Sequence, residues 1–304
     1  MTSLPAAAFD AETPGAAAMP APWAGSGRRC PVSGQRLQRS AGTAELAFRA
    51  DGGTTRLERA WQSGCARLRL PRQHDVPFPT AVLINTAGGL TGGDRLSAEV
   101  TVGAGAQAVV TGQAAEKIYR SAGGVAAVDN RLLLGPGARL DWLPQETILF
   151  DGGALERRTT VDMAADARLT ATELVIFGRQ ARGETVAQAL LADAWRVRRD
   201  GRLLFAEATR LAGPVHDLLR RPATGAGAIA LALVVHVAPD AEGRLQAVRD
   251  RLAEASGVEA GASAFDGMVA IRLLARSGQA LRAAVLDVLA PLRDGLPPPR
   301  PWLV

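Results

Sequence analysis

The chain has 304 residues, of which 47% are hydrophobic and 21% are charged, with a formal net charge of +5. This balance is typical of a globular protein with room for one large domain or two ordinary ones. The basic residues are scattered and only 4% of the chain is aromatic, which argues against a nucleic-acid partner. No apolar run reaches the roughly 18 residues that span a membrane, so we expect no membrane partner.

The N-terminal residues 1–40 are rich in Ala, Pro, Gly and Ser and have little periodicity, which predicts a disordered extension ahead of a domain at 41–304. This start carries Asp10 and Glu12 and does not resemble a secretory leader. Cys30 and Cys65 are too few for a structural zinc site, and we interpret them as free thiols. Together these features predict a cytoplasmic protein.

The first strands of the domain are expected in residues 44–64, where the turn signal Asp51-Gly52-Gly53 separates two strand-like halves. Residues 65–70 alternate in the manner of a half-buried strand. Residues 81–96, AVLINTAGGLTGGDRL, then join a short apolar strand to four glycines and Asp94. Paired glycines indicate tight turns, because glycine accepts positive φ and close backbone approach. The stretch is a weak candidate for a phosphate loop, because no helix and no lysine follow it.

Three later segments share one plan, in which a small-residue turn leads to an alanine and then to a strand-like run that ends at a glutamate. The segments are residues 102–116, 134–146 and 163–173. Their alanines, Ala106, Ala138 and Ala167, lie 32 and then 29 positions apart. A period of about 30 residues suggests strand units stacked on one another, although a β-meander could produce the same loose similarity. The fold is therefore predicted to be mostly β, with a stacked, helix-like β architecture.

Helical patterns appear only late in the chain. Residues 228–238 predict a buried strand, and helices are expected at about 241–256 and 277–293. The G-x-G-x-x-A spellings at 103–108 and 225–230 each precede a strand-like run, which is the wrong context for a dinucleotide site. His236 lies within the apolar run VVHVA and is interpreted as a core histidine.

Carboxylates beside glycine turns or strand ends are the remaining candidates for chemistry: Asp94, Glu116, Glu146, Asp151, Glu173 and Glu184. They are either solvated strand ends, a pair of glycosidase carboxylates, or oxygen ligands along the path of a divalent cation. Residues 117–121, KIYRS, hold the only lysine and the only tyrosine of the chain. Lys117, Tyr119 and Arg120 are therefore candidates for a specific contact with a partner.

Four long motifs, in this order and spacing, resemble the urease accessory protein UreD family, called UreH in some organisms: NTAGGLTGGDRL (85–96), EKIYRS (116–121), WLPQETILFDGG (142–153) and ELVIFGRQARGE (173–184). The ending PRPW (299–302) is also similar to the Pro-Arg-x-Trp ending that is common there. The resemblance covers roughly residues 44–304.

This resemblance implies a non-enzymatic maturation factor with a mostly β, stacked fold and two helices. It implies three protein partners: a UreF-type helical accessory protein, a UreG-type GTPase and apo-urease. The GTPase carries nickel and binds through the UreF-type protein. No cofactor is expected to be tightly bound; Ni2+ would pass through an internal channel, with Asp94, Glu146 and Glu173 as the candidate liners. Weak oxygen ligands suit such transport, because they hold a divalent cation and release it. The alternative is a β-stack carbohydrate-active enzyme that uses two of the same carboxylates.

Overall fold

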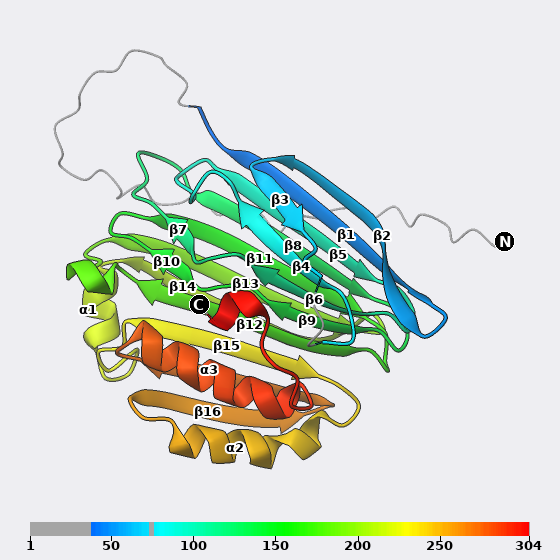
Figure 1. Cartoon of the computed structure of the whole chain (residues 1–304). Coiled ribbons are helices and arrows are strands. Elements are labelled where there is room, and N and C mark those ends of the chain that lie inside the picture. The colour runs from blue at the N-terminus through cyan, green and yellow to red at the C-terminus, as the bar shows by residue number, and fades with distance from the viewer. Residues whose placement is uncertain (1–37, 73–75, 304) are drawn as a thin grey trace. The chain divides into compact units, whose positions relative to one another are not determined.

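The computed structural model describes residues 38–72 and 76–303, in which two β-sheets face each other and the last two α-helices cover one outer face (Figure 1). Nearly all of the predicted disordered extension at 1–40 lies outside the described residues, and so does Cys30. Cys65 forms no disulfide.

The first sheet has seven strands in the order β14-β13-β11-β8-β5-β1-β2. Their bounds are β1 Ala41–Asp51, β2 Thr54–Gly64, β5 Arg95–Val102, β8 Ala126–Leu134, β11 Ala154–Met163, β13 Ala189–Arg199 and β14 Arg202–Gly213. Strands β1 and β2 form the predicted hairpin, in which Asp51 pairs with Thr54 across two glycines of positive φ. The four strands β5, β8, β11 and β13 are parallel neighbours, so this sheet is built mainly by crossover connections.

The second sheet has ten strands, eight of them in the order β16-β17-β15-β12-β9-β6-β4-β3, while the short β10 pairs with β12 and with β7. Their bounds are β3 Ala66–Arg69, β4 Thr80–Asn85, β6 Gln107–Gly112, β7 Glu116–Ile118, β9 Arg139–Leu143, β10 Thr147–Leu149, β12 Arg168–Phe177, β15 Ala230–Val237, β16 Val258–Phe265 and β17 Met268–Ala275. Strands β6, β9 and β12 are parallel neighbours.

Three consecutive coils connect the two sheets, because β5 leads to β6, β8 to β9 and β11 to β12. Each coil places one strand in each sheet and pairs in parallel with the next coil. The predicted stacked, helix-like β architecture is confirmed. Apolar side chains from both sheets, among them Phe48, Val100 and Trp142, fill the space between them.

The turns of these coils stack as the sequence period predicts. Ala106, Ala138 and Ala167 are all fully buried. The backbone N–H groups that follow Ala138 and Ala167 donate to the carbonyls of Ala106 and Ala138, at 2.9 and 2.7 Å. Gly105 and Gly137 adopt φ values of 66° and 64°, which lets each chain turn tightly without the cost of a Cβ. Alanine at the stacked position lets neighbouring coils approach closely.

The described residues form the α-helices α1 Val215–Arg220, α2 Leu245–Glu254 and α3 Gly278–Leu292. They also form the 3₁₀ turns η1 Gln180–Arg182, η2 Ala241–Arg244 and η3 Arg300–Leu303. The two helices predicted near the C-terminus are confirmed. The first begins with the 3₁₀ turn η2, and the second begins after Ser277, whose hydroxyl accepts from the N–H of Ala280. Helix α1 was not predicted. No helix within the described residues is long and apolar enough to span a bilayer.

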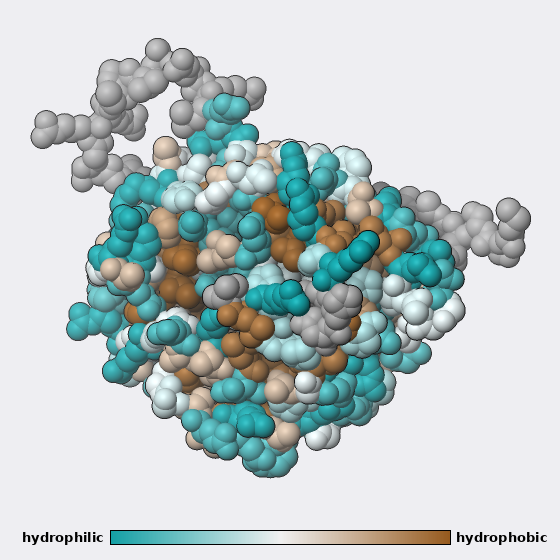
Figure 2. All heavy atoms as spheres, in the orientation of Figure 1, coloured by the Kyte–Doolittle hydropathy of each residue, from teal (hydrophilic) through white to brown (hydrophobic). Residues whose placement is uncertain are grey.

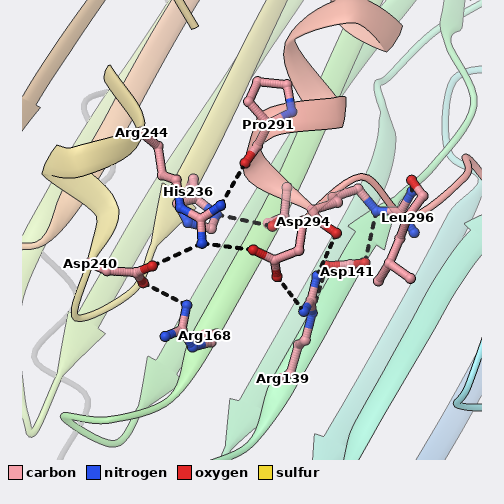
Figure 3. A network of polar contacts seen from close by, with 11 residues as sticks. Arg139, Asp141, Arg168, His236, Asp240, Arg244, Pro291, Asp294 and Leu296 are labelled. Carbon is pink, nitrogen blue, oxygen red and sulfur yellow. Dashed lines mark hydrogen bonds and ion pairs between the residues drawn. The ribbon is translucent and has the colours of Figure 1, made fainter. Parts of the chain in front are cut away.

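Ion pairs connect strand β12 of the ten-stranded sheet to η2, and η2 to the end of α3 (Figure 3). Asp240 accepts from Arg168 and Arg244 at 2.6 and 2.9 Å, and Arg244 reaches Asp294 at 2.7 Å. His236 lies in the same region, 3% exposed, with Nδ1 3.1 Å from the Thr170 hydroxyl. The interpretation of His236 as a core histidine is confirmed. Burial is the main cause that lowers its pKa to about 4.

Candidate functional site

Asp94 closes the glycine-rich turn that follows β4. Its carboxylate is buried and accepts two backbone N–H groups, from Ser40 and Thr91, each at 2.8 Å. These bonds close the turn on itself and tie it to the residue that precedes β1. A carboxylate that accepts backbone donors in this way holds the chain in place, as the side chain of a capping aspartate does.

Gly89 in the same turn lies directly beneath Tyr119. It adopts a φ of 146°, and a Cβ added there would lie 2.3 Å from Cε2 of the tyrosine ring. The Tyr119 hydroxyl donates to the carbonyl oxygen of Gly88 at 3.0 Å. Glycine is therefore required at position 89 by its φ and by the ring above it.

The segments that follow β4, β7, β10 and β12 stack at one end of the two sheets. Leu90 bridges to Ile118, and Ile118 pairs in parallel register with Leu149, which pairs with Phe177. All four side chains are buried in one apolar cluster. This cluster fixes the relative positions of the four loops at the left-hand end in Figure 1, where β7 and β10 end.

Above this cluster, side chains from the stacked loops contact one another at the surface. The Tyr119 ring stands edge-on to Phe150, with centroids 5.2 Å apart and planes at 82°. The Arg179 guanidinium lies 4.6 Å from the centroid of the Phe150 ring and donates twice to Glu184, at 2.9 and 3.0 Å. Arg120 pairs with Asp151. We call these residues the stacked-loop surface: Tyr119, Arg120, Phe150, Asp151, Arg179 and Glu184.

A cavity of about 220 Å³ lies between the two sheets next to these loops. Gly88, Gln113, Ala114 and Lys117 line it and are exposed, so they form its mouth. Trp142, Asn130, Arg157 and Glu173 also line it and are buried. The volume is enough for several water molecules or a small hydrated ion.

Two residues in the deep part of the cavity, Arg157 and Glu173, belong to a buried cluster of ionisable side chains that also includes Asp193. Arg157 lies 2.5 Å from Glu173 and 2.5 Å from Asp193, and all three are at most 8% exposed. The Thr147 hydroxyl accepts from the same guanidinium at 2.9 Å. Burial raises the pKa of Glu173 to about 8, because the charge of Arg157, which it shares with Asp193, only partly offsets the loss of water. Burial therefore favours the protonated form of Glu173, and the contact with Arg157 favours the ionised form.

Glu116 is a second carboxylate that lines the cavity, close to the mouth. The Asn85 amide donates to both of its oxygens, at 3.1 and 3.2 Å. Burial raises the pKa of Glu116, and the hydrogen bond from Asn85 opposes that rise. The cavity thus has one carboxylate near its mouth and one at depth, each less acidic than an exposed glutamate.

The family model "UreD urease accessory protein" matches residues 40–303 of the chain, and so includes all four loops and the cavity. The urease accessory protein UreD of Methylobacterium sp. (strain 4-46) is 51% identical over 272 residues, which are 88% of this chain and 96% of the relative. The UreD protein of Rhizobium leguminosarum bv. trifolii (strain WSM2304) is 46% identical over 271 residues, 89% of this chain and 98% of the relative.

The chain belongs to the UreD family. UreD proteins are urease accessory proteins, that is, assembly factors rather than catalysts. The resemblance that the four motifs indicate is confirmed, and the chain has a role in urease maturation. The carbohydrate-active alternative gains no support from this family.

The three carboxylates predicted to line one path in this UreD chain lie in three different environments. Only Glu173 lines the cavity. Asp94 is engaged by backbone N–H groups, and Glu146 pairs with Arg282 of α3 at 2.8 Å. Within residues 38–72 and 76–303, no three Asp, Glu, His or Cys side chains lie close enough together to hold a metal ion. Glu116, which the sequence also identified as a candidate, lines the cavity with Glu173.

The three candidate contact residues in KIYRS lie side by side at the loop end of the fold. Tyr119 is 40% exposed and the Arg120 side chain 70% exposed. Lys117 is exposed at the mouth of the cavity. Their role in binding a partner remains a prediction.

Sequence reasoning missed Arg157 and Asp193, which hold Glu173 in place. Arg157 belongs to the segment LERRTT, in which charged residues suggest a solvated strand, and Asp193 lies among alanines and leucines. Both face inward because β11 and β13 are in parallel register, with Arg157 directly opposite Asp193. A pairing register of this kind has no signal in a single sequence.

Proposed function

We propose that this UreD-family chain is a scaffold in urease maturation that links a helical accessory protein and a nickel-carrying GTPase to apo-urease in the cytoplasm, and that Ni2+ passes through its cavity. The observation that carries the proposal is the convergence of four separate motifs on one end of the fold. There they form both an exposed aromatic and arginine surface and the mouth of a cavity with two carboxylates.

The cavity suits a cation in transit rather than a resident one. Glu116 and Glu173 offer carboxylate oxygens, and neither belongs to a cluster of three or more ligands within the described residues. Few oxygen ligands bind a divalent cation weakly, so it can leave again. Burial raises the pKa of both carboxyls, so protons compete with a divalent cation for these oxygens.

The stacked-loop surface suits protein binding. Tyrosine and arginine are the residue types that most often dominate the free energy of an interface, and here both are exposed on a rigid base. Tyr119 is already held by Phe150 and by Gly88, so little conformational entropy is lost when a partner covers it.

The test is co-expression with the urease operon of a host from which the native copy of this gene has been removed. Wild-type protein is expected to co-purify with the helical accessory protein and apo-urease, and to restore urease nickel content measured by atomic absorption. If the wild-type protein co-purifies with neither partner, the scaffold proposal is refuted.

Glu173→Gln separates transport from assembly. It keeps the side-chain shape and removes the carboxylate, so we expect normal co-purification and a several-fold loss of nickel in urease. Glu156→Gln is the matched control, because Glu156 is an exposed residue of β11, the strand that precedes β12 in the chain, and does not line the cavity. Equal nickel loading by the two variants would refute the route through the cavity.

A further inference from the structure

Four arginines near the stacked-loop surface have no acidic partner. Arg182 ends η1, Arg220 ends α1 and is followed by Arg221, and Arg276 follows β17. All four are exposed, and none forms an ion pair within the part of the chain that the structure describes. Arg120 and Arg179 of the stacked-loop surface, by contrast, are each paired with a carboxylate.

Hydrogen bonds connect the three segments, distant in the sequence, that carry these arginines. The Arg221 carbonyl accepts from the N–H of Ala226 at 3.0 Å, and the Ala226 carbonyl accepts from Nη2 of Arg276 at 2.8 Å. The N–H of Gly278 is in turn 3.4 Å from Oε1 of Gln180, the first residue of η1. We call Arg182, Arg220, Arg221 and Arg276 the arginine cluster.

The arginine cluster and the stacked-loop surface lie over the same apolar cluster of buried side chains. Val215 and Leu219 of α1 are buried in the same apolar cluster as Ile118, Leu149 and Phe177. The N–H of His216 also donates to the carbonyl of Val186, in the loop that carries Glu184. In Figure 1, α1 lies at the same end as β7 and β10, and Figure 2 shows a hydrophobic patch at that end bordered by hydrophilic side chains.

Nearby acidic residues do not neutralise this charge. Glu184 is engaged by Arg179 and is only partly exposed, while Asp217 of α1 is exposed and forms no ion pair with the described residues. Four guanidinium groups that form no ion pair with the described residues lie at the same end of the fold as Tyr119, and their positive charge attracts carboxylates and speeds association.

We propose that the arginine cluster binds a carboxylate-rich surface of the protein partner that docks on the stacked-loop surface. The inference rests on the proposed scaffold function and adds the chemistry of the partner surface. A nucleic-acid ligand is a poorer fit, because single strands need stacking aromatics. Among the exposed large side chains of the described residues, the aromatic ones are Trp61, Tyr119 and Phe265, and only Tyr119 belongs to this end.

The experiment measures association kinetics between the full chain and the purified helical accessory protein, and separately apo-urease, at about 50 and 300 mM NaCl. The double variants Arg220→Glu/Arg221→Glu and Arg182→Glu/Arg276→Glu are each expected to slow association with one of these partners about tenfold at the lower salt. The wild-type association rate is expected to fall with salt, and the variants are expected to lose most of that dependence.

Arg196→Glu/Arg198→Glu is the matched control, because it makes the same charge change on β13, away from the stacked loops, at residues that also form no ion pair with any described residue. Thermal melts check that all variants fold. If the cluster variants bind both partners at the control rate, the inference is overturned while the scaffold function stands. If wild-type protein binds neither partner, the scaffold function itself falls. Binding of a 20-nucleotide single strand more tightly than either protein would also overturn the inference.

Discussion

A Cβ atom on Gly89 would lie 2.3 Å from Cε2 of Tyr119 and 2.8 Å from the carbonyl oxygen of Lys117. Two motifs that are separate in the sequence are therefore in van der Waals contact, and the glycine of one determines where the aromatic ring of the other lies. The glycine-rich turn thus supports the stacked-loop surface as well as reversing the chain.

Gly89→Ala and Gly88→Ala form a matched pair that tests this relationship. Both glycines have positive φ, 146° and 75°, but nothing lies within 4 Å of a Cβ at Gly88. Gly88→Ala is expected to cost about 1 kcal/mol of unfolding free energy from backbone strain alone. Gly89→Ala must also displace Tyr119, so we expect a loss of roughly 3 kcal/mol and weaker co-purification with partners. Urea denaturation measures the unfolding free energy of each variant. An equal loss of unfolding free energy in Gly88→Ala and Gly89→Ala would contradict the contact between Gly89 and Tyr119 as the cause.

The stacked fold could be predicted from the sequence because its signals are local and repeat. Ala106, Ala138 and Ala167 recur because each coil must make the same tight turn. The hairpin turn at Asp51 could also be predicted, because an Asp-Gly step between two strand-like runs is a typical turn signal. Helix α1 was missed because six residues carry too little periodicity to be recognised.

The candidate site was only partly predictable, because it depends on which face of a strand each side chain occupies. Glu146 and Glu173 end similar repeats, so the repeat pattern places them opposite each other. In the structure Thr147 pairs with Val175, and the register therefore places Glu146 opposite Leu174 instead. This one-residue offset sends Glu173 into the cavity and leaves Glu146 to pair with Arg282. The offset comes from strand register, which the repeat pattern alone does not fix.

Glu173→Gln is expected to change the pH dependence of stability. In the folded chain the pKa of Glu173 is raised to about 8, above its usual 4.5, so between these values the folded state binds a proton that the unfolded state has lost. The contribution of Glu173 to stability is therefore full below pH 4.5 and is lost as the pH rises through 8. Glutamine resembles the protonated acid and does not titrate, so the variant should lose less stability between pH 6 and 9. The measurement is the unfolding free energy from urea denaturation as a function of pH. Parallel curves for wild type and Glu173→Gln would refute the raised pKa of Glu173.

His236 is expected to limit stability at acidic pH. Burial lowers its pKa from 6.5 to about 4, so between these values the unfolded state binds more protons than the folded one. Stability from this group is therefore present above pH 6.5 and is lost as the pH falls towards 4, by up to about 3 kcal/mol. His236→Asn removes the titration, and its unfolding free energy should fall less steeply over that range. If the unfolding free energy of His236→Asn falls as steeply with acid as that of the wild type, the loss of stability is caused by protonation of the carboxylates in the surrounding ion pairs and not by His236.

Ala138→Leu tests whether the stacked turns hold the coils together. Ala138 is fully buried between the turns at Ala106 and Ala167, and its carbonyl accepts from the backbone N–H of Arg168 at 2.7 Å. A leucine there has no room, so one coil must move away from the next at a cost of about 1–3 kcal/mol. Ala104→Leu adds the same atoms to an exposed position of a neighbouring turn and is expected to change stability by no more than about 0.5 kcal/mol. Hydrogen exchange at Arg139 and Arg168 should quicken only in Ala138→Leu, because those amides bridge adjacent coils. Unchanged protection there would mean that the turns are not what holds the stack in register.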